Sequence, residues 1–305
     1  MSDTDGRGGQ GQRTVVRARD GRTLEVATSG PADGRTLIFH HGTPSAPVPF
    51  GPLVDAAAEA GLRLVAYARP GYAGSERRPG RSVADAVEDV ADIADALGVP
   101  EFVTLGFSGG GPHALACAAL LPERCLAAAT IGGVAPFAAA GLDWLAGMGP
   151  ENVEEFGLAV QGPEALAPFL TAQAAELATV SAADIVAAFG GLLPPVDKQA
   201  LTGVVGEWVA ASFRRAVARG TDGWADDDAA FVAPWGFDLD QISVPAAVWQ
   251  GSVDLMVPFA HGQWLADQVP TARAHLLEGH GHLSLTAANL PAILADLVDL
   301  APVKG

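Results

Sequence analysis

Short apolar segments of strand length alternate with helical patterns along most of this chain, and that alternation narrows the folds open to it. The first two segments, 15–19 and 23–27, flank an Asp-Gly hairpin signal. Further strand-like runs lie at 36–39, 63–67, 101–105, 126–131, 246–250 and 273–277. Because strands alternating with helices join through right-handed crossovers, the pattern predicts an α/β fold with a mostly parallel eight-stranded sheet flanked by helices.

Three helical segments are expected in the sheet-forming part of the chain. The clearest spans 83–97, with Ser82 and Asp85 at capping-box spacing and Gly98 at the expected C-terminal position. Another begins near Gly109, and a last one spans 291–300.

Between 134 and 233 the alternation stops, and the chain reads as helices broken by glycine and proline. An insertion of roughly a hundred residues is too long for a loop. We therefore expect a helical cap at 134–233, inserted into a core domain formed by 14–133 and 234–305.

Composition excludes several classes of partner. Of the 305 residues 49% are apolar and 17% charged, which suits one large domain with an inserted part. The net charge of −17 argues against nucleic acid and anionic membranes as partners.

Residues 1–13 are polar and glycine-rich, so a disordered tail is expected there rather than a signal peptide. Two cysteines, Cys117 and Cys125, fit a reducing, cytoplasmic interior. The sequence leaves open whether the protein forms a homo-oligomer.

One serine stands among glycines between a predicted strand and a predicted helix. Gly106-Phe107-Ser108-Gly109-Gly110 fits the pattern Gly-x-Ser-x-Gly. A strand passing directly into a helix strains the residue between them, and small neighbours at Gly106 and Gly110 let the two elements approach. The Ser108 hydroxyl would then be exposed at the carboxyl edge of the sheet, where open α/β sheets bind ligands. A glycine-rich structural turn is the plain alternative.

A serine hydroxyl needs a base to act as a nucleophile, and the base needs an acid to orient it. Of seven histidines, His282 is preferred: it follows the last predicted strand, and Gly281 gives its backbone room to turn the ring inward. His280 is the competitor. Asp254 follows the strand at 246–250. A lone aspartate in a loop is usually a turn former, but the order Ser108, Asp254, His282 favours Asp254 as the acid. Asp143 is a weaker reserve.

A tetrahedral intermediate also needs backbone donors for its oxyanion. Pro44 has no N–H, which leaves Thr43 as the donor in "HHGTP", and Gly109 supplies the second at a helix N-terminus. Supporting roles are expected for His41, Gly42, Gly106 and Gly110. His40 and His113 are expected to pack in the interior.

With these residues in place, the chain resembles the α/β-hydrolase-fold serine hydrolases that carry a helical cap. The resemblance covers nearly everything after residue 20, through "HHGTP", "ARPGYAGS", "LGFSGGGPHALA", "WQGSVDLMVP" and "GHGHLSL". Similar members include carboxylesterases, lactonases, proline iminopeptidases, C–C bond hydrolases and cofactor-free perhydrolases. Many members have an aspartate where Ala68 stands, and haloperoxidase-like members tend to have an aromatic residue at Thr43. Dehalogenases and epoxide hydrolases use an aspartate nucleophile, against which Ser108 argues.

The sequence therefore predicts a serine hydrolase that cleaves carboxylic ester or related acyl bonds of a small molecule through an acyl-enzyme on Ser108, with no cofactor or metal. Aromatic residues of the cap are candidates for an apolar pocket, although each more readily belongs to the cap's own core. Glu151, Glu154 and Glu155 keep a second hypothesis open, because cap carboxylates hold the substrate amine in iminopeptidases. A third hypothesis is a non-catalytic small-molecule receptor on the same fold.

Overall fold

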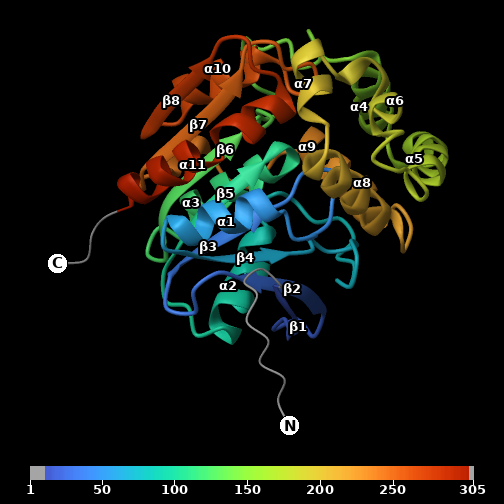
Figure 1. Cartoon of the computed structure of the whole chain (residues 1–305). Helices are drawn as coiled ribbons and strands as arrows, with labels where there is room; N and C mark the ends of the chain where they lie inside the picture. The colour runs from blue at the N-terminus through green and yellow to red at the C-terminus, as the bar shows by residue number, and fades with distance from the viewer. Residues whose placement is uncertain (1–10, 302–305) are drawn as a thin grey trace.

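The computed structural model describes residues 11–301, and in it the predicted strands form one sheet (Figure 1). The strand order is β1-β2-β4-β3-β5-β6-β7-β8. The pairs β1–β2 and β2–β4 are antiparallel, and every other neighbouring pair is parallel. The expected α/β fold class is thus confirmed. The strands are β1 Gln12–Arg17, β2 Thr23–Ser29, β3 Arg35–His40, β4 Leu62–Tyr67, β5 Phe102–Phe107, β6 Cys125–Ile131, β7 Ala246–Gly251 and β8 Ala272–Leu277.

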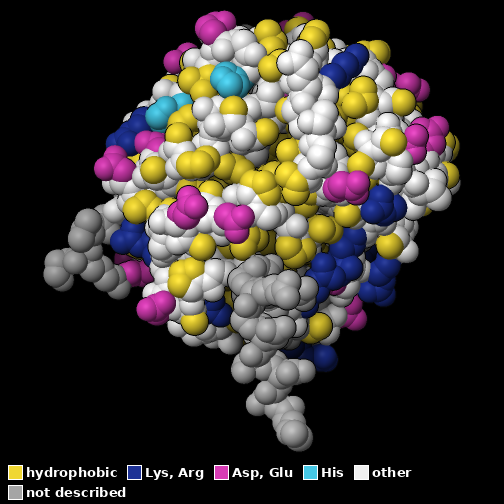
Figure 2. Space-filling model, in the orientation of Figure 1, with side chains coloured by type: hydrophobic (Ala, Val, Ile, Leu, Met, Phe, Trp, Pro, Cys, Tyr) yellow, Lys and Arg dark blue, Asp and Glu magenta, His cyan; other side chains and the backbone are white. Residues whose placement is uncertain are grey.

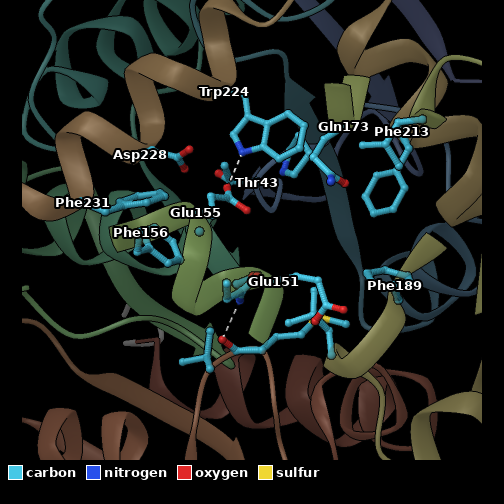
Figure 3. A pocket seen from close by; sticks show the side chains of 18 of the residues that line it. Thr43, Glu151, Glu155, Phe156, Gln173, Phe189, Phe213, Trp224, Asp228 and Phe231 are labelled. Atoms are coloured by element: carbon cyan, nitrogen blue, oxygen red, sulfur yellow. Dashed lines mark hydrogen bonds between the residues drawn. The ribbon is translucent and has the colours of Figure 1, made fainter. Parts of the chain in front are cut away.

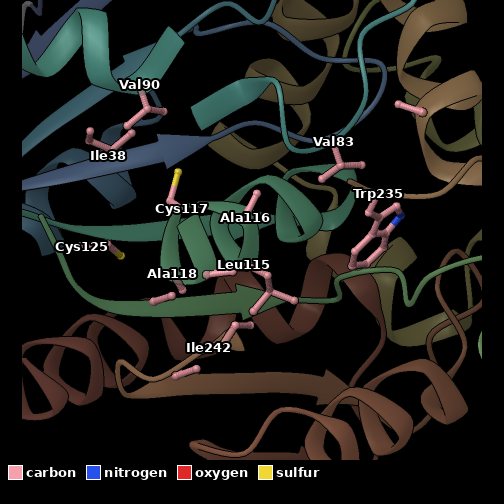
Figure 4. Packing of buried hydrophobic residues seen from close by; sticks show 14 of the residues in the cluster. Ile38, Val83, Val90, Leu115, Ala116, Cys117, Ala118, Cys125, Trp235 and Ile242 are labelled. Carbon is pink, nitrogen blue, oxygen red and sulfur yellow. The ribbon is translucent and has the colours of Figure 1, made fainter. Parts of the chain in front are cut away.

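Helices cover both faces of this sheet because successive strand residues point to opposite sides. In β5, Phe102 packs with α2 (Ala86–Ala96), α3 (Gly111–Leu120) and α10 (Phe259–Gln268). Val103 and Leu105 pack on the other side with α1 (Gly51–Glu59) and α11 (His282–Leu300). Figure 4 shows the first of these layers, in which small side chains of α3 let the helix lie close to the sheet.

Parallel pairing brings the carboxyl ends of six strands, β4, β3, β5, β6, β7 and β8, to one edge of the sheet. The segments that follow β3, β5, β6, β7 and β8 all leave from that edge (Figure 1). They carry, in this order, Thr43, Ser108, Gly132, Asp254 and His282.

Between β6 and β7, the described part of the chain forms six α-helices and no strand. They pack around an apolar cluster that also takes in Tyr72 and Met256 from the sheet-forming part of the chain. The helices are α4 Pro150–Gln161, α5 Pro163–Leu177, α6 Ile185–Ala188, α7 Pro195–Ala200, α8 Val204–Val217 and α9 Asp222–Val232.

The division of the chain into core and cap stays a prediction. Residues 134–149, which this division assigns to the helical cap, differ from the rest of the insertion. They contain no regular helix and attach to α10. There, His261 accepts a hydrogen bond from the Ala135 amide (3.1 Å) and contacts the Trp144 carbonyl oxygen (2.9 Å). We name the helical part of the insertion, 150–232, the inserted helices.

Three expected boundaries are wrong. β1 begins at Gln12, inside the segment expected to be a tail, because Gln12 and Arg13 already pair with β2; residues 1–10 lie outside the described range. α2 begins at Ala86, because the Asp85 carboxylate accepts hydrogen bonds from Ser82 and closes a turn before the helix. α11 begins at His282, nine residues before Pro291, which lies inside the helix. The base candidate therefore opens a helix and is not in a loop.

Surface charge and the longest helix complete the description. Acidic and basic side chains are dispersed over the face in Figure 2, without one dominant acidic patch. Within residues 11–301, α11 is long and apolar enough to span a membrane by length and composition. Its apolar side chains Leu285, Leu290, Ile293, Leu294 and Leu297 are buried against the sheet, as in a core helix.

Candidate functional site

Ser108 lies at the sharp turn where β5 passes into the first turn of α3. Its φ of +53° places a residue other than glycine in the left-handed region, the strained conformation that the motif predicts. A Cβ on Gly106 would overlap the backbone of Gly110, and one on Gly110 would overlap the carbonyl of His40. Both glycines are therefore required by the close approach of strand and helix, and the half-buried Ser108 is left facing the carboxyl edge.

Asp254 and His282 meet at the same edge. Nδ1 of His282 lies 2.7 Å from Oδ2 of Asp254. The other oxygen of Asp254 accepts hydrogen bonds from the amides of Met256 and Val257, both at 2.9 Å, so the carboxylate is held in place. Gln250 donates to Oδ2 at 3.1 Å. This arrangement fixes the ring with Nδ1 as its donor nitrogen.

Space for the His282 ring comes from Gly132, at the end of β6. Its φ is +55°, and a Cβ there would lie 2.8 Å from both Cε1 and Nδ1 of the ring. Gly281, to which the sequence reading assigned that role, is in an extended conformation, and a Cβ on it would meet the carboxylate of Asp197 instead.

The second ring nitrogen of His282, Nε2, is not engaged by Asp254. This atom is buried and has no hydrogen-bond partner among the described residues. His282 and Ser108 both line a cavity of about 60 Å³. Burial lowers the pKa of His282, but the charge and hydrogen bond of Asp254 and the charge of Asp197 outweigh it, so the pKa lies above the usual value. His280 makes no such contact with Asp254, and the structure brings His282 rather than its competitor to the acid.

Thr43 and Gly109, the two predicted oxyanion donors, lie side by side. A Cβ on Gly109 would come within 2.5 Å of Oγ1 of Thr43, and both residues border the same cavity as Ser108. His41 holds this loop: its Nδ1 is 2.8 Å from the Gly42 carbonyl oxygen, and its Nε2 accepts the Arg69 amide at 3.2 Å. Burial and the neighbouring Arg69 charge lower the pKa of His41, which keeps it neutral.

His40 and His113 are fully buried, as the sequence predicts for them. His40 contacts the hydroxyl of Tyr67 at 3.2 Å. Burial lowers the pKa of His113 to about 4. Neither ring borders the cavities that Ser108 lines.

A buried ionic cluster behind Thr43 is the part of the site that sequence reasoning missed. Asp227 of α9 accepts hydrogen bonds from Thr43 Oγ1 (2.6 Å) and from Tyr72 (2.9 Å), and forms ion pairs with Arg69 and Arg81, both at 2.6 Å. Burial raises the pKa of Asp227, but the two guanidinium charges outweigh it and hold the pKa well below the usual value. Arg69 thus pairs with a carboxylate from α9, because the residue before it, Ala68, provides none.

A signal for Asp227 existed in the run Asp226-Asp227-Asp228. Successive residues of a helix point about 100° apart, so three consecutive acids cannot all face solvent on a helix that packs against a core. Asp227 and Asp228 are fully buried in the structure.

The larger cavity at Ser108 measures about 110 Å³ and is walled mainly by aromatic and aliphatic side chains of the inserted helices (Figure 3). Six of the aromatic candidates, for which the sequence favoured a place in the cap's own core, line this cavity: Phe156, Phe169, Phe189, Phe213, Phe231 and Trp224. Trp144 instead packs between Phe137, Phe156 and His261.

Two carboxyl groups face each other in the wall of this cavity. Glu155 of α4 accepts a hydrogen bond from Trp224 Nε1 at 2.6 Å, and no described donor reaches either carboxyl oxygen of Asp228 (Figure 3). Burial raises the pKa of Glu155 to about 7, and burial together with Glu155 raises that of Asp228 well above its usual value. Of the other two glutamates singled out, Glu151 also lines the cavity and Glu154 is exposed.

Among residues 11–301, no three His, Cys, Asp or Glu side chains are grouped closely enough to hold a metal ion. The groups gathered at the carboxyl edge are instead a hydroxyl, an imidazole, a carboxylate and two backbone amides. These are the types of group that nucleophilic hydrolysis uses.

Comparison with known proteins agrees with the fold. Residues 35–286 match the family model described as the alpha/beta hydrolase fold, and the chain belongs to that family. It is similar to epoxide hydrolase B from Mycobacterium tuberculosis, with 30% identity over 155 residues, which cover 49% of this chain and 43% of that protein. The aligned part is thus less than half of this relative's length.

Two solved structures share the architecture over almost their whole length. One is a hydrolase from Pseudomonas aeruginosa PA01, with a TM-score of 0.67, 22% identity, and coverage of 94% of this chain and 97% of that one. The other is the enol-lactonase from Burkholderia xenovorans LB400, with a TM-score of 0.68, 20% identity, and coverage of 94% and 99%. At such identities the likeness concerns the fold alone.

Proposed function

We propose that this protein is a serine hydrolase of carboxylic esters or related acyl compounds, acting through an acyl-enzyme on Ser108. One observation carries the proposal: His282 is bound by Asp254 through Nδ1, its buried Nε2 has no hydrogen-bond partner within residues 11–301, and the residue lines the same cavity as Ser108. A base oriented by an acid on one side and free on the other is what a serine nucleophile requires.

The proposed reaction proceeds in two halves. Nε2 of His282 takes the hydroxyl proton as Oγ of Ser108 bonds to the acyl carbon, and the amides of Thr43 and Gly109 hold the resulting oxyanion. The imidazolium then gives its proton to the leaving oxygen, and the bond to that oxygen breaks. Water repeats the sequence on the acyl-enzyme, and releases the acid. Asp254 orients the ring through Nδ1 in both halves.

The first test is Ser108→Ala, assayed on a panel of acyl esters, thioesters and lactones. We expect kcat for the best ester to fall by about 10⁵–10⁶ while the far-UV spectrum and Tm stay those of the wild type. Ser181→Ala, the same chemical change at a serine that lines no part of the two cavities, serves as the control. Wild-type turnover in Ser108→Ala would reject the mechanism.

A second candidate, an aminopeptidase that takes substrates with a free amine, is favoured by the carboxyl groups in the cavity wall. Glu151, Glu155 and Asp228 line the cavity, and no lysine or arginine among residues 11–301 does. A substrate ammonium between Ser108 and the Glu155–Asp228 pair would give these carboxyl oxygens a cationic partner, with aromatic faces around it.

Prolyl arylamides test this second candidate. The pKa of Glu155 is about 7, so the pair gains negative charge as the pH rises through that value, and KM for the amide should fall over the same range. Glu155→Gln should raise that KM about tenfold or more. Glu154→Gln, on the exposed side of the same helix, should leave it unchanged. If no prolyl arylamide is cleaved, the aminopeptidase candidate is dismissed.

A further inference from the structure

Asp197 belongs to the inserted helices, yet its carboxylate is bonded to the helix that begins with His282. It lies in α7 and is fully buried. Its Oδ2 accepts a hydrogen bond from the His282 amide and its Oδ1 accepts one from the Ser284 amide, both at 2.8 Å. Figure 1 shows α7 lying against the start of α11. A carboxylate at this position satisfies amides that a helix leaves unpaired at its N-terminus.

The place that Asp197 occupies is shaped for a carboxylate. A Cβ on Gly281 would come within 2.5 Å of Oδ1 of Asp197, so the residue before the helix must be glycine for the carboxylate to fit. The Gly281 amide is bonded to the Ser284 hydroxyl at 2.8 Å. Within residues 11–301, no lysine or arginine forms an ion pair with Asp197. Its charge therefore acts on the helix terminus and on the ring that follows.

We propose that Asp197 is a positioning residue for the base: it fixes the first turn of α11, so that the His282 ring keeps its place in the cavity that Ser108 also lines, and its charge stabilises the imidazolium formed during the reaction. The proposal rests on the proposed function, because it assigns Asp197 a role in the reaction of Ser108. According to this proposal, the inserted helices position His282 in addition to forming the wall of the cavity.

The groups around His282 support a direct electrostatic role. Two charged residues act on the ring, Asp254 from the segment after β7 and Asp197 from α7, and both raise its pKa against the effect of burial. Two further neighbours of the ring carry no charge: the Phe107 ring, whose centroid is 4.9 Å from that of His282, and Gly132. His261 of α10 is near Asp254, and burial lowers its pKa to about 4, so it is neutral in the working range.

The decisive variant is Asp197→Asn in the full chain, assayed on an ester that the wild type turns over. Asparagine keeps the size and one acceptor oxygen, but it loses the charge and turns a donor toward one of the two amides. We expect kcat to fall about tenfold with little change in KM. We also expect the acid limb of the kcat/KM profile, which reports the base in the free enzyme, to move down by about half a pH unit or more.

Two further variants keep the result interpretable. Lys198→Gln changes the charge of the next residue, which is exposed, and should retain the wild-type profile. Gly281→Ala displaces the carboxylate while leaving Asp197 itself unchanged, and should reproduce the fall in kcat; it decides the matter if Asp197→Asn does not fold, as judged by its far-UV spectrum.

The outcomes separate this inference from the proposed function. An unchanged kcat and acid limb in folded Asp197→Asn would overturn the inference and leave the Ser108 mechanism standing. A lower kcat with an unmoved acid limb would also overturn it, because that pattern indicates a structural role only. Failure of the proposed function shows instead in Ser108→Ala, as wild-type turnover.

Discussion

At the scale of single residues, the candidate site depends on where side chains are absent. Ser108 can occupy its turn because Gly106 and Gly110 let strand and helix approach. The sequence predicts this arrangement, because the glycines stand beside the serine in one motif. Gly132 has no such neighbour in the chain. Its importance comes from a ring 150 positions away in sequence, at His282, and nothing local in "TIGGVAP" indicates it.

Gly132→Ala tests this steric requirement. A Cβ at this position would lie 2.8 Å from two atoms of the His282 ring, so the ring must move away from Asp254. We expect kcat/KM to fall by about 10² or more. Gly141→Ala is the matched control, because Gly141 has a φ of +81° and no atom within 4 Å of its Cβ position. Both variants should lose about 1 kcal/mol of stability through the positive φ, and only the first should lose activity. Equal activity in the two would contradict the argument.

At the scale of elements, α9 is fastened to the loops after β3 and β4 by one buried carboxylate. Asp227 accepts hydrogen bonds from Thr43 and pairs with Arg69 and Arg81, and the side chains of Arg69 and Asp227 are 1% and 0% exposed. The helix thus holds the loop that carries Thr43, a candidate oxyanion donor. Local pattern could place α9 as a helix, but it could not identify its partners, because those partners are more than 140 positions earlier in the chain.

Asp227→Asn should destabilise the protein strongly. Removing one partner of a buried ion pair leaves an uncompensated charge, at a typical cost of about 3–5 kcal/mol. Urea unfolding at neutral pH measures the change. Asp222→Asn on the same helix is the control: its carboxylate is 60% exposed in its pair with Arg77, and the expected loss is below about 1 kcal/mol. A similar loss in both variants would show that the cluster does not hold α9.

At the scale of the whole molecule, a net charge of −17 is carried by a surface on which acidic and basic groups are dispersed (Figure 2). Self-repulsion of this excess charge opposes the compact state. Raising the ionic strength from about 0.01 M to about 0.15 M shortens the Debye length from about 30 Å to about 8 Å, so we expect Tm at pH 8 to rise with added sodium chloride. A falling Tm would mean that exposed ion pairs such as those of Arg273 contribute more than the net repulsion costs.

The sequence by itself determined the sheet, the turn at Ser108 and the order of the three candidate catalytic residues, because periodicity, glycine spacing and strand ends are local properties. Only the tertiary structure decided which residues hold that site in place. The amide of His282 is 85 positions from Asp197, the hydroxyl of Thr43 is 184 positions from Asp227, and Glu155 meets Asp228 across two helices. From sequence alone, an aspartate in a helix is expected to be exposed to solvent. Only the fold shows that it is buried against a specific partner.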